Sequence, residues 1–314
     1  MMTGRVAFLF PGQGSQYVGM GKDFAEKFST ARDVFSTVDR ICGKSISSLC
    51  FNGPIEALTI TDTLQPAVIA VDLAILGVLR ERGVEPYMSA GHSVGEYAAL
   101  ASAGVVDFPD ALRLAAKRGE LMHREAMAHP GGMVAVIGLD LASVRRITEE
   151  AGEMGVLDVA NHNAAEQVVI TGESAALKRA VSIVKEMKAR AVPLKVSGAW
   201  HSRLMADGVS EFRELMEELN FKPPQSLMIF NSTADSESDP VKIKEMMAGQ
   251  LVKPVLWYDT VRRMAADGVT AYVEVGPKNV LAGLVKKILP ADSNATLHNV
   301  QDIESLERFI EDLD

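Results

Sequence analysis

One segment, residues 87–104, constrains the fold of this 314-residue chain more than any other. It begins with a short apolar stretch, continues with the sequence GHSVG at residues 91–95, and ends as an alanine-rich stretch closed by Gly104. Glycine is typical of the position just after a helix, so the pattern predicts a short strand, a sharp turn and a helix. This order is what an α/β fold with a functional turn between strand and helix requires.

Ser93 lies at the centre of this turn and is the candidate nucleophile. In a G-x-S-x-G turn, the small residues two before and two after the serine let the chain turn sharply and expose the hydroxyl. The turn also places the N–H of Val94 and the N-terminus of the next helix beside a developing oxyanion. The bare pattern is frequent by chance, so the strand and helix predicted around it are what favour a nucleophile over an ordinary strand-to-helix turn.

A serine hydroxyl needs a base within hydrogen-bonding distance, and the chain has six histidines. His92 adjoins the serine, but a sharp turn is expected to point it away. His201 follows the end of a predicted strand, where the chain returns to the main sheet, and is the best candidate for the base. A capping or core histidine is the alternative interpretation of His201.

Predicted strands and helices alternate along most of the chain. A buried strand at 6–10 ends at Pro11-Gly12, and the glycines of segment 12–16 allow a ligand to approach the backbone closely. Further strands are predicted at 227–231 and 270–275, and helices at 21–41, 65–82, 109–128, 203–219, 241–251, 279–288 and, as an amphipathic tail, 302–314. This alternation predicts an α/β core in which a short parallel sheet is flanked by helices.

Residues 132–197 follow a different pattern. Strands are predicted at 133–138, 156–160, 167–171 and 191–196, and helices at 141–154 and 174–189. The order βαββαβ predicts a ferredoxin-like subdomain inserted into the core. We therefore expect a core formed by residues 1–130 and 198–314, and a ferredoxin-like subdomain at 131–197.

Composition narrows the classes of function. Hydrophobic residues make up 47% of the chain and charged residues 23%, which is ordinary for a folded soluble protein. A net charge of −9 argues against nucleic-acid binding, which needs a basic surface. The two cysteines, Cys42 and Cys50, show neither a disulfide framework nor metal-ligand spacing, so we expect packing residues in a reducing compartment.

Nothing in the first ten residues predicts a cleaved leader sequence. The longest apolar run, 67–79, is too short to cross a bilayer and carries Asp72 in its middle, which predicts a buried helix. We expect a cytoplasmic protein that does not associate with a membrane, and a monomer, because no exposed apolar seam stands out.

Taken together, these segments resemble the malonyl-CoA:acyl carrier protein transacylase family along nearly the whole chain. The motifs that carry the resemblance follow the family's order: FPGQGSQ at 10–16, QPA at 65–67, GHSVGEY at 91–97, RG at 118–119, NHN at 161–163, QVVITG at 167–172, GAWHS at 198–202, Asn231, Gln250 and EVGP at 274–277. The resemblance implies a hydrolase-like core with a ferredoxin-like insert, in agreement with the pattern of predicted elements.

The resemblance also implies roles for the reacting groups. Ser93 would be the acylated nucleophile and His201 its general base and acid, while the backbone N–H groups of Gln13 and Val94 would form the oxyanion hole. Gln250 would lie where a backbone carbonyl orients His201, which implies a serine–histidine dyad. Asp107, Asp110, Asp140 and Asp158 lie between serine and histidine in the chain, but none belongs to a recognisable triad motif.

Recognition of the acyl group is implied in the same way. Arg118 would pair bidentately with a malonyl carboxylate, for which a guanidinium is better suited than an ammonium. Trp200 would narrow the pocket against an α-methyl group, and Asn163 would shape the cleft or cap a turn. Without the resemblance, Arg118 would be interpreted as an exposed helix cation, and Gln13 and Gln250 as solvated amides.

The implied activity is a ping-pong transfer of a malonyl group from malonyl-CoA to the phosphopantetheine thiol of an acyl carrier protein, in fatty-acid synthesis. Neither a metal nor a bound cofactor is expected, because coenzyme A enters as the substrate thioester. An acyltransferase of a polyketide pathway, an acyl hydrolase on the same fold and a non-catalytic docking module are the alternatives. An acidic carrier protein would need a basic patch, for which the candidates are Lys286, Lys287, Lys185, Lys188, Arg190 and Lys195.

Overall fold

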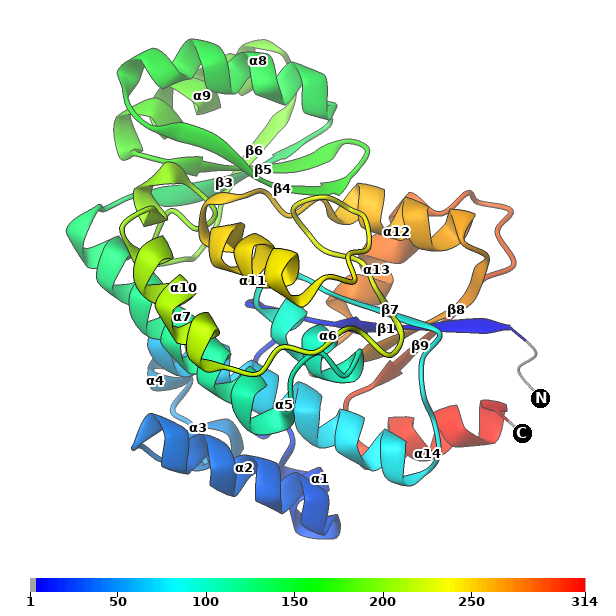
Figure 1. Ribbon diagram of the computed structural model, residues 1–314. Helices are drawn as coiled ribbons and strands as arrows, with labels where there is room; N and C mark the ends of the chain where they lie inside the picture. Colours follow the sequence, from blue (N-terminus) through cyan, green and yellow to red (C-terminus); the bar gives the residue numbers. More distant parts are fainter. Residues whose placement is uncertain (1–3, 314) are drawn as a thin grey trace.

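The computed structural model describes residues 4–313 and contains two sheets in that range (Figure 1). Residues 1–3 and 314 lie outside the described range. The expectations about a leader and about the tail helix fall partly on these residues. The larger sheet has the order β7-β2-β1-β8-β9, and every neighbouring pair is parallel. Its strands are β1 (Arg5–Phe10), β2 (Met88–Gly91), β7 (Leu227–Met228), β8 (Val269–Val275) and β9 (Thr296–Val300).

Helices cover both faces of this parallel sheet, so its central strand is apolar on both sides. Along β1, Ala7 and Leu9 pack in a cluster with α12 (Trp257–Ala266) and α13 (Val280–Ile288). The alternate residues Phe8 and Phe10 face the opposite layer. That layer contains α5 (Thr61–Glu81), α6 (Glu96–Ser102) and α7 (Phe108–Ala128), with α1 (Lys22–Lys27), α2 (Ser29–Cys42), α3 (Ile46–Asn52) and α4 (Ile55–Leu58) beyond them.

Helix α5 is long and apolar enough to cross a membrane by length and composition alone. The 18-residue window that meets this test is 94% buried within the protein, where the helix packs against α2 and α7. The prediction of a buried helix is confirmed, although the helix begins at Thr61 and is longer than its uninterrupted apolar run.

The smaller sheet is antiparallel, with the order β4-β5-β3-β6. It consists of β3 (Gly132–Ile137), β4 (Leu157–Ala164), β5 (Gln167–Gly172) and β6 (Arg190–Pro193). Helices α8 (Leu141–Ala151) and α9 (Ser174–Glu186) cover the face turned away from the core (Figure 1). Val134 and Val136 pack beneath these helices, whereas Met133 and Ala135 join the main core cluster. The predicted ferredoxin-like order is confirmed, and one face of its sheet is shared with the core.

Several predicted boundaries are wrong. The helix expected at 21–41 is divided into α1 and α2, because Phe28 between them is extended, with φ −117° and ψ 133°. The strand expected at 227–231 is confined to β7, and β6 ends at Pro193, where proline removes a backbone donor. Helix α10 (Gly208–Glu218) begins five residues after its predicted start, α11 (Pro240–Gly249) ends earlier than predicted, and α14 (Ile303–Leu313) forms the expected tail helix.

Both cysteines are free, and burial raises the pKa of Cys42 to about 11 and of Cys50 to about 12. They are therefore thiols at neutral pH, and Cys50 packs in the main core cluster as expected.

Candidate active site

Ser93 lies where β2 turns directly into α6 through a short 3₁₀ turn, Ser93–Gly95. The two glycines are required by close packing: a Cβ on Gly91 would lie 1.9 Å from the carbonyl carbon of Gly95, and a Cβ on Gly95 would lie 2.1 Å from the carbonyl oxygen of Phe10. Ser93 itself has φ 55°, in the left-handed region that residues other than glycine rarely adopt. The predicted strand, turn and helix are confirmed, and the turn directs the hydroxyl into a cavity.

Two amide side chains hold the backbone of Ser93 in this conformation. Asn231 accepts a hydrogen bond from the Ser93 N–H through Oδ1 (2.7 Å) and donates one to the Gly91 carbonyl through Nδ2 (2.6 Å). Gln250 donates from Nε2 to the Ser93 carbonyl (2.8 Å). The N–H and the C=O of Ser93 are thus both fixed by residues more than a hundred positions downstream.

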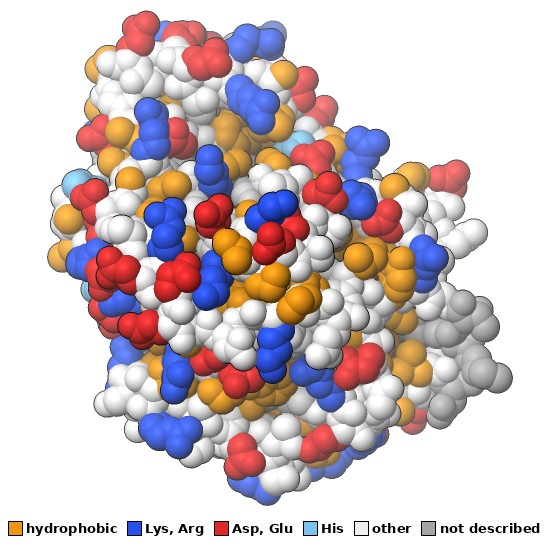
Figure 2. Space-filling model, in the orientation of Figure 1, with side chains coloured by type: hydrophobic (Ala, Val, Ile, Leu, Met, Phe, Trp, Pro, Cys, Tyr) orange, Lys and Arg blue, Asp and Glu red, His pale blue; other side chains and the backbone are white. Residues whose placement is uncertain are grey.

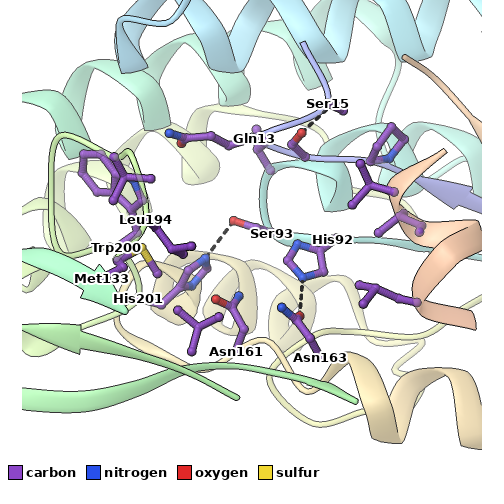
Figure 3. A pocket seen from close by; sticks show the side chains of 18 of the residues that line it. Gln13, Ser15, His92, Ser93, Met133, Asn161, Asn163, Leu194, Trp200 and His201 are labelled. Atoms are coloured by element: carbon purple, nitrogen blue, oxygen red, sulfur yellow. Dashed lines mark hydrogen bonds between the residues drawn. The ribbon is translucent and has the colours of Figure 1, made fainter. Parts of the chain in front are cut away.

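The imidazole of His201 lies against the Ser93 hydroxyl, with Nε2 2.7 Å from Oγ (Figure 3). On its other side Nδ1 lies 2.9 Å from the carbonyl oxygen of Lys253 and 3.1 Å from that of Gln250. Carbonyl oxygens only accept hydrogen bonds, so Nδ1 carries the proton and Nε2 presents a lone pair to the hydroxyl. Burial, and then the charges of Arg118 and His92, lower the pKa of His201 to about 3. The imidazole is therefore neutral at physiological pH.

The four aspartates singled out between Ser93 and His201 in the chain are engaged elsewhere, Asp110 by pairing with Arg113. Asp107 accepts from the Asp110 N–H at the start of α7, and Asp140 accepts from the Ser143 N–H at the start of α8. Asp158 binds Arg203. Within residues 4–313 no carboxylate is hydrogen-bonded to His201, so the arrangement is a pair supported by carbonyl groups.

Arg118 is buried, with 1% of its surface exposed, and its guanidinium reaches the hydroxyl of Ser93. Nη2 donates to Ser93 Oγ (3.1 Å), Nη1 to Gln65 Oε1 (2.7 Å), and Nε to Gln250 Oε1 (2.9 Å). All three acceptors are neutral, and among the described residues Arg118 forms no ion pair with a carboxylate. Burial lowers the pKa of Arg118, yet a guanidinium stays charged at physiological pH. A buried positive charge beside the serine is thus left for a ligand to neutralise.

These groups open into a cavity of about 210 Å³ between the core and the insert. Its lining comprises Pro11, Gly12, Gln13, Ser15, His92, Ser93, Val94, Arg118, Met122, Met133, Asn161, Asn163, Gln167, Val169, Leu194, Val196, Trp200, His201, Val280, Leu281 and Leu284. Trp200, Leu194 and Met133 gather at one end of the cavity, and His92 and Asn163 lie at the other (Figure 3). The two sides therefore differ in chemistry, with polar groups around Ser93 and apolar side chains along the opposite wall.

Most residues singled out in the sequence line this cavity, including Gln13, Val94, Asn163 and Trp200. Gln250 does not line it; it lies buried behind Ser93 and contributes through hydrogen bonds. The ring of His92 also lines the cavity. Its Nε2, however, donates to Asn163 Oδ1 (2.9 Å), so that the ring is hydrogen-bonded to the insert and has no hydrogen bond to Ser93.

Four contributors to the site were not assigned a role from the sequence. Gln65, Glu96 and Asn231 belong to the motifs quoted above, which was the only signal for them. Lys253 acts through its carbonyl, for which side-chain identity offers no signal.

A possible metal-binding group lies outside the cavity. Donor atoms of Glu125, His129 and Asp207 lie within 4.8 Å of one another, with His129 Nε2 3.5 Å from Asp207 Oδ2. Arg124 already pairs with Glu125 at 2.8 Å, and this surface group is accounted for as a network of ion pairs.

A doubly covered parallel sheet, a serine at a glycine-flanked corner and a neutral histidine on its hydroxyl define an α/β protein of the serine–histidine acyl-transfer class. The chain belongs to the acyl transferase domain family, whose sequence profile matches residues 7–312.

The chain is similar to bacterial transacylases along almost its whole length. It is 38% identical over 313 residues to the malonyl CoA-acyl carrier protein transacylase of Bacillus subtilis strain 168, covering 98% of this chain and 97% of that protein. It superposes on the acyl carrier protein S-malonyltransferase of Vibrio cholerae with a TM-score of 0.92 and 39% identity, covering 97% and 99% of the two chains. A malonyl-transacylase solved in complex with its type II polyketide synthase acyl-carrier protein superposes with a TM-score of 0.93 and 36% identity, covering 98% and 99%.

Proposed function

We propose that this protein transfers the malonyl group of malonyl-CoA to the phosphopantetheine thiol of an acyl carrier protein, for fatty-acid synthesis, through a malonyl ester of Ser93. The observation that carries the proposal is the buried guanidinium of Arg118, 3.1 Å from Ser93 Oγ and bonded only to neutral acceptors. An acyl group with its own carboxylate supplies the direct ion pair that Arg118 has with no described carboxylate, in bidentate geometry beside Ser93. An acyl hydrolase for simple acyl groups has no use for this charge.

The first half of the reaction follows from the hydrogen bonds of His201. Its Nε2 takes the proton of Ser93 Oγ as the oxygen attacks the thioester carbonyl. The carbonyls of Gln250 and Lys253 accept from Nδ1–H and stabilise the imidazolium that forms. The backbone N–H groups of Gln13 and Val94, both at the cavity, bind the oxyanion. Collapse of the tetrahedral intermediate expels the coenzyme A thiolate, which takes the proton from His201.

The second half reverses these steps with a different thiol. The phosphopantetheine thiol gives its proton to His201 and attacks the malonyl-serine ester, and the same N–H groups bind the oxyanion. Ser93 then leaves with the proton. Because Arg118 lowers the pKa of His201, neutralisation of Arg118 by the malonyl carboxylate makes His201 a stronger base when the correct acyl group is bound.

Intact-mass spectrometry after mixing with malonyl-CoA tests the proposal. The wild-type protein is expected to gain one malonyl group and Ser93→Ala none, because alanine has no hydroxyl to acylate. Acetyl-CoA and methylmalonyl-CoA in parallel report on the choice of acyl group. A malonyl adduct on the alanine variant would reject Ser93 as the nucleophile.

We further propose that the carrier protein docks where α13 meets the insert at the cavity. Lys287 Nζ donates to Gln167 Oε1 (3.2 Å), which joins α13 to β5 beside the lining residue Leu284. Cations and anions are interspersed over the face shown in Figure 2, without a large area of one sign. In this proposal, Lys287 and the neighbouring Lys286 are the local cationic contacts for an acidic carrier. If so, added salt slows transfer to the carrier more than loading from coenzyme A, and equal slowing of both steps contradicts this site.

We propose a cytoplasmic monomer, in which residues 131–197 form one unit and residues 1–130 with 198–314 the other. A polyketide pathway is the second candidate setting, and it is favoured by the similarity to a transacylase solved with a polyketide carrier protein. Transfer assays with fatty-acid and polyketide carrier proteins in parallel separate the two settings.

A further inference from the structure

Glu96 is a fully buried carboxylate directly behind the nucleophile, at the first position of α6. Only 1% of its surface is exposed, and Glu96 is not among the residues that line the cavity. Its Oε1 accepts a hydrogen bond from the backbone N–H of Asn231 (2.7 Å), and its Oε2 accepts one from the side-chain Nε2 of Gln250.

These two partners are the residues that hold the backbone of Ser93. Asn231 accepts from the Ser93 N–H, and Gln250 donates to the Ser93 carbonyl. Gln250 also accepts from Arg118 Nε through its side chain, and from His201 Nδ1 through its carbonyl. The carboxylate of Glu96 therefore contacts both residues that hold Ser93, and through Gln250 it is also linked to His201 and Arg118.

The left-handed conformation of Ser93, φ 55°, makes such support necessary. A non-glycine residue keeps this conformation only where the surrounding structure determines it by several contacts. The hydrogen bonds to both sides of Ser93 supply those contacts, and Glu96 fixes the groups that make them.

We propose that Glu96 is a positioning residue of the transfer reaction: its ionised carboxylate orients Asn231 and Gln250, which align Ser93 with His201 and Arg118. The inference rests on the proposed function, because alignment is measured as the rate at which Ser93 is acylated.

The protonation state of Glu96 decides whether this support is intact. Both partners of Glu96 are N–H donors, so both of its oxygens must accept. A protonated carboxyl would place an O–H against one of these donors. Burial raises the pKa of Glu96 to about 7; the hydrogen bonds from Asn231 and Gln250, and then the charge of Arg118 on α7, favour ionisation and oppose this rise only in part. Tyr97, on the same helix, is neutral because burial raises its pKa. The support is thus lost as the pH falls through about 7.

Glu96→Gln tests the role at nearly constant volume. The amide offers one accepting oxygen, and its NH₂ group opposes one of the two donors, as in the protonated acid. We expect the first-order rate of malonyl-serine formation to fall about 10²-fold, because small misplacements of reacting groups cost rate, while the KM for malonyl-CoA changes little. Glu96→Asp, which keeps the charge on a shorter side chain, is expected to restore part of the rate.

A pH series provides a second readout that does not depend on a variant. Wild-type loading is expected to fall between pH 8 and pH 5.5 towards the rate of the glutamine variant, whose own rate stays flat. His201, with a pKa of about 3, does not titrate in this range. A flat wild-type profile, or a glutamine variant that loads at the wild-type rate, overturns the positioning role.

Asp72→Asn is the matched control. It converts another fully buried carboxyl to its amide, and among the described residues both Asp72 oxygens lack a hydrogen-bond partner. We expect this variant to load at the wild-type rate; equal slowing would mean that converting any buried carboxyl to its amide has the effect, and would overturn the specific role. A wild-type protein that never gains a malonyl adduct overturns the proposed function itself, whereas a wild type that loads as fast as Glu96→Gln overturns only this inference.

Discussion

The two sides of the cavity differ in the kind of contact that their side chains make. Around Ser93, buried polar groups of Arg118, His201 and Gln250 come from the core and are joined to one another and to Ser93 by hydrogen bonds. The insert and its junction with the core add apolar side chains such as Met133, Val169 and Leu194 to the opposite wall, beside the amides of the insert. Polar groups in a buried network hold fixed positions because each partner restricts the others. Apolar contacts restrict size and exclude water. Changes on the first side should therefore affect rate, and changes on the second should affect the choice of acyl group.

The largest effect is expected on the polar side, from His201→Ala. Removing the base should lower the rate of malonyl-serine formation by about 10²–10⁴-fold, the usual contribution of a positioned base. Quenched-flow mixing with intact-mass detection measures the rate, and circular dichroism verifies the fold. Loading within a few-fold of wild type would mean that Ser93 is deprotonated by another group.

Arg118→Ala should show that the polar side also recognises charge. Loss of a buried charged hydrogen-bonded pair is expected to cost malonyl transfer about 2–5 kcal/mol in kcat/KM, while acetyl transfer is retained or rises.

Arg113→Ala is the matched control for Arg118, because Arg113 lies on the same helix but is exposed and, within residues 4–313, pairs with Asp110 alone. It should behave as wild type with both thioesters. Equal losses of malonyl and acetyl transfer in Arg118→Ala would assign Arg118 a structural role.

On the apolar side, Trp200→Ala should change selectivity more than rate. The indole lines the cavity, and replacing it makes room for an α-methyl group. We expect the ratio of kcat/KM for methylmalonyl-CoA to that for malonyl-CoA to rise by a factor of about 10–200, which corresponds to the 1–3 kcal/mol typical of one methyl group. Competition between the two thioesters, read by mass, measures this ratio. An unchanged ratio would remove Trp200 from the specificity determinants and weaken the contrast between the two sides.

The smallest effect concerns a buried carboxylate outside the network. Glu274 accepts from the Ala282 N–H through Oε2 (2.8 Å), but among the described residues its Oε1 has no partner. Burial raises its pKa from 4.5 to about 7, so its contribution to stability is full below pH 4.5 and is lost as the pH rises through 7.

Glu274→Gln should therefore gain stability relative to wild type between pH 5 and pH 8, on the order of 1–2 kcal/mol. Urea unfolding at the two pH values measures the difference, and a difference that does not change with pH would contradict it.

The sequence alone determined the elements whose signals are local. The strand, turn and helix around Ser93 were predictable because only glycine fits at positions 91 and 95, and the βαββαβ order of the insert because hydrophobic periodicity changes there. The buried helix α5 was predictable from its apolar run. Ser93 and His201 were candidates from their local patterns, whereas the other site residues came from the resemblance, and all the proposed catalytic roles remain predictions for the variants above.

Only the tertiary structure decided the rest. Strand β9 is a polar segment, Thr296–Val300, that becomes a strand because β8 offers an unpaired edge, and α12 is defined by the face it packs against the sheet. Arg118 is an ordinary helix cation until the fold buries it, and the carbonyl of Lys253 near His201 is independent of the side chain that carries it. Burial and backbone contacts between distant segments depend on how the elements pack, which no local pattern encodes.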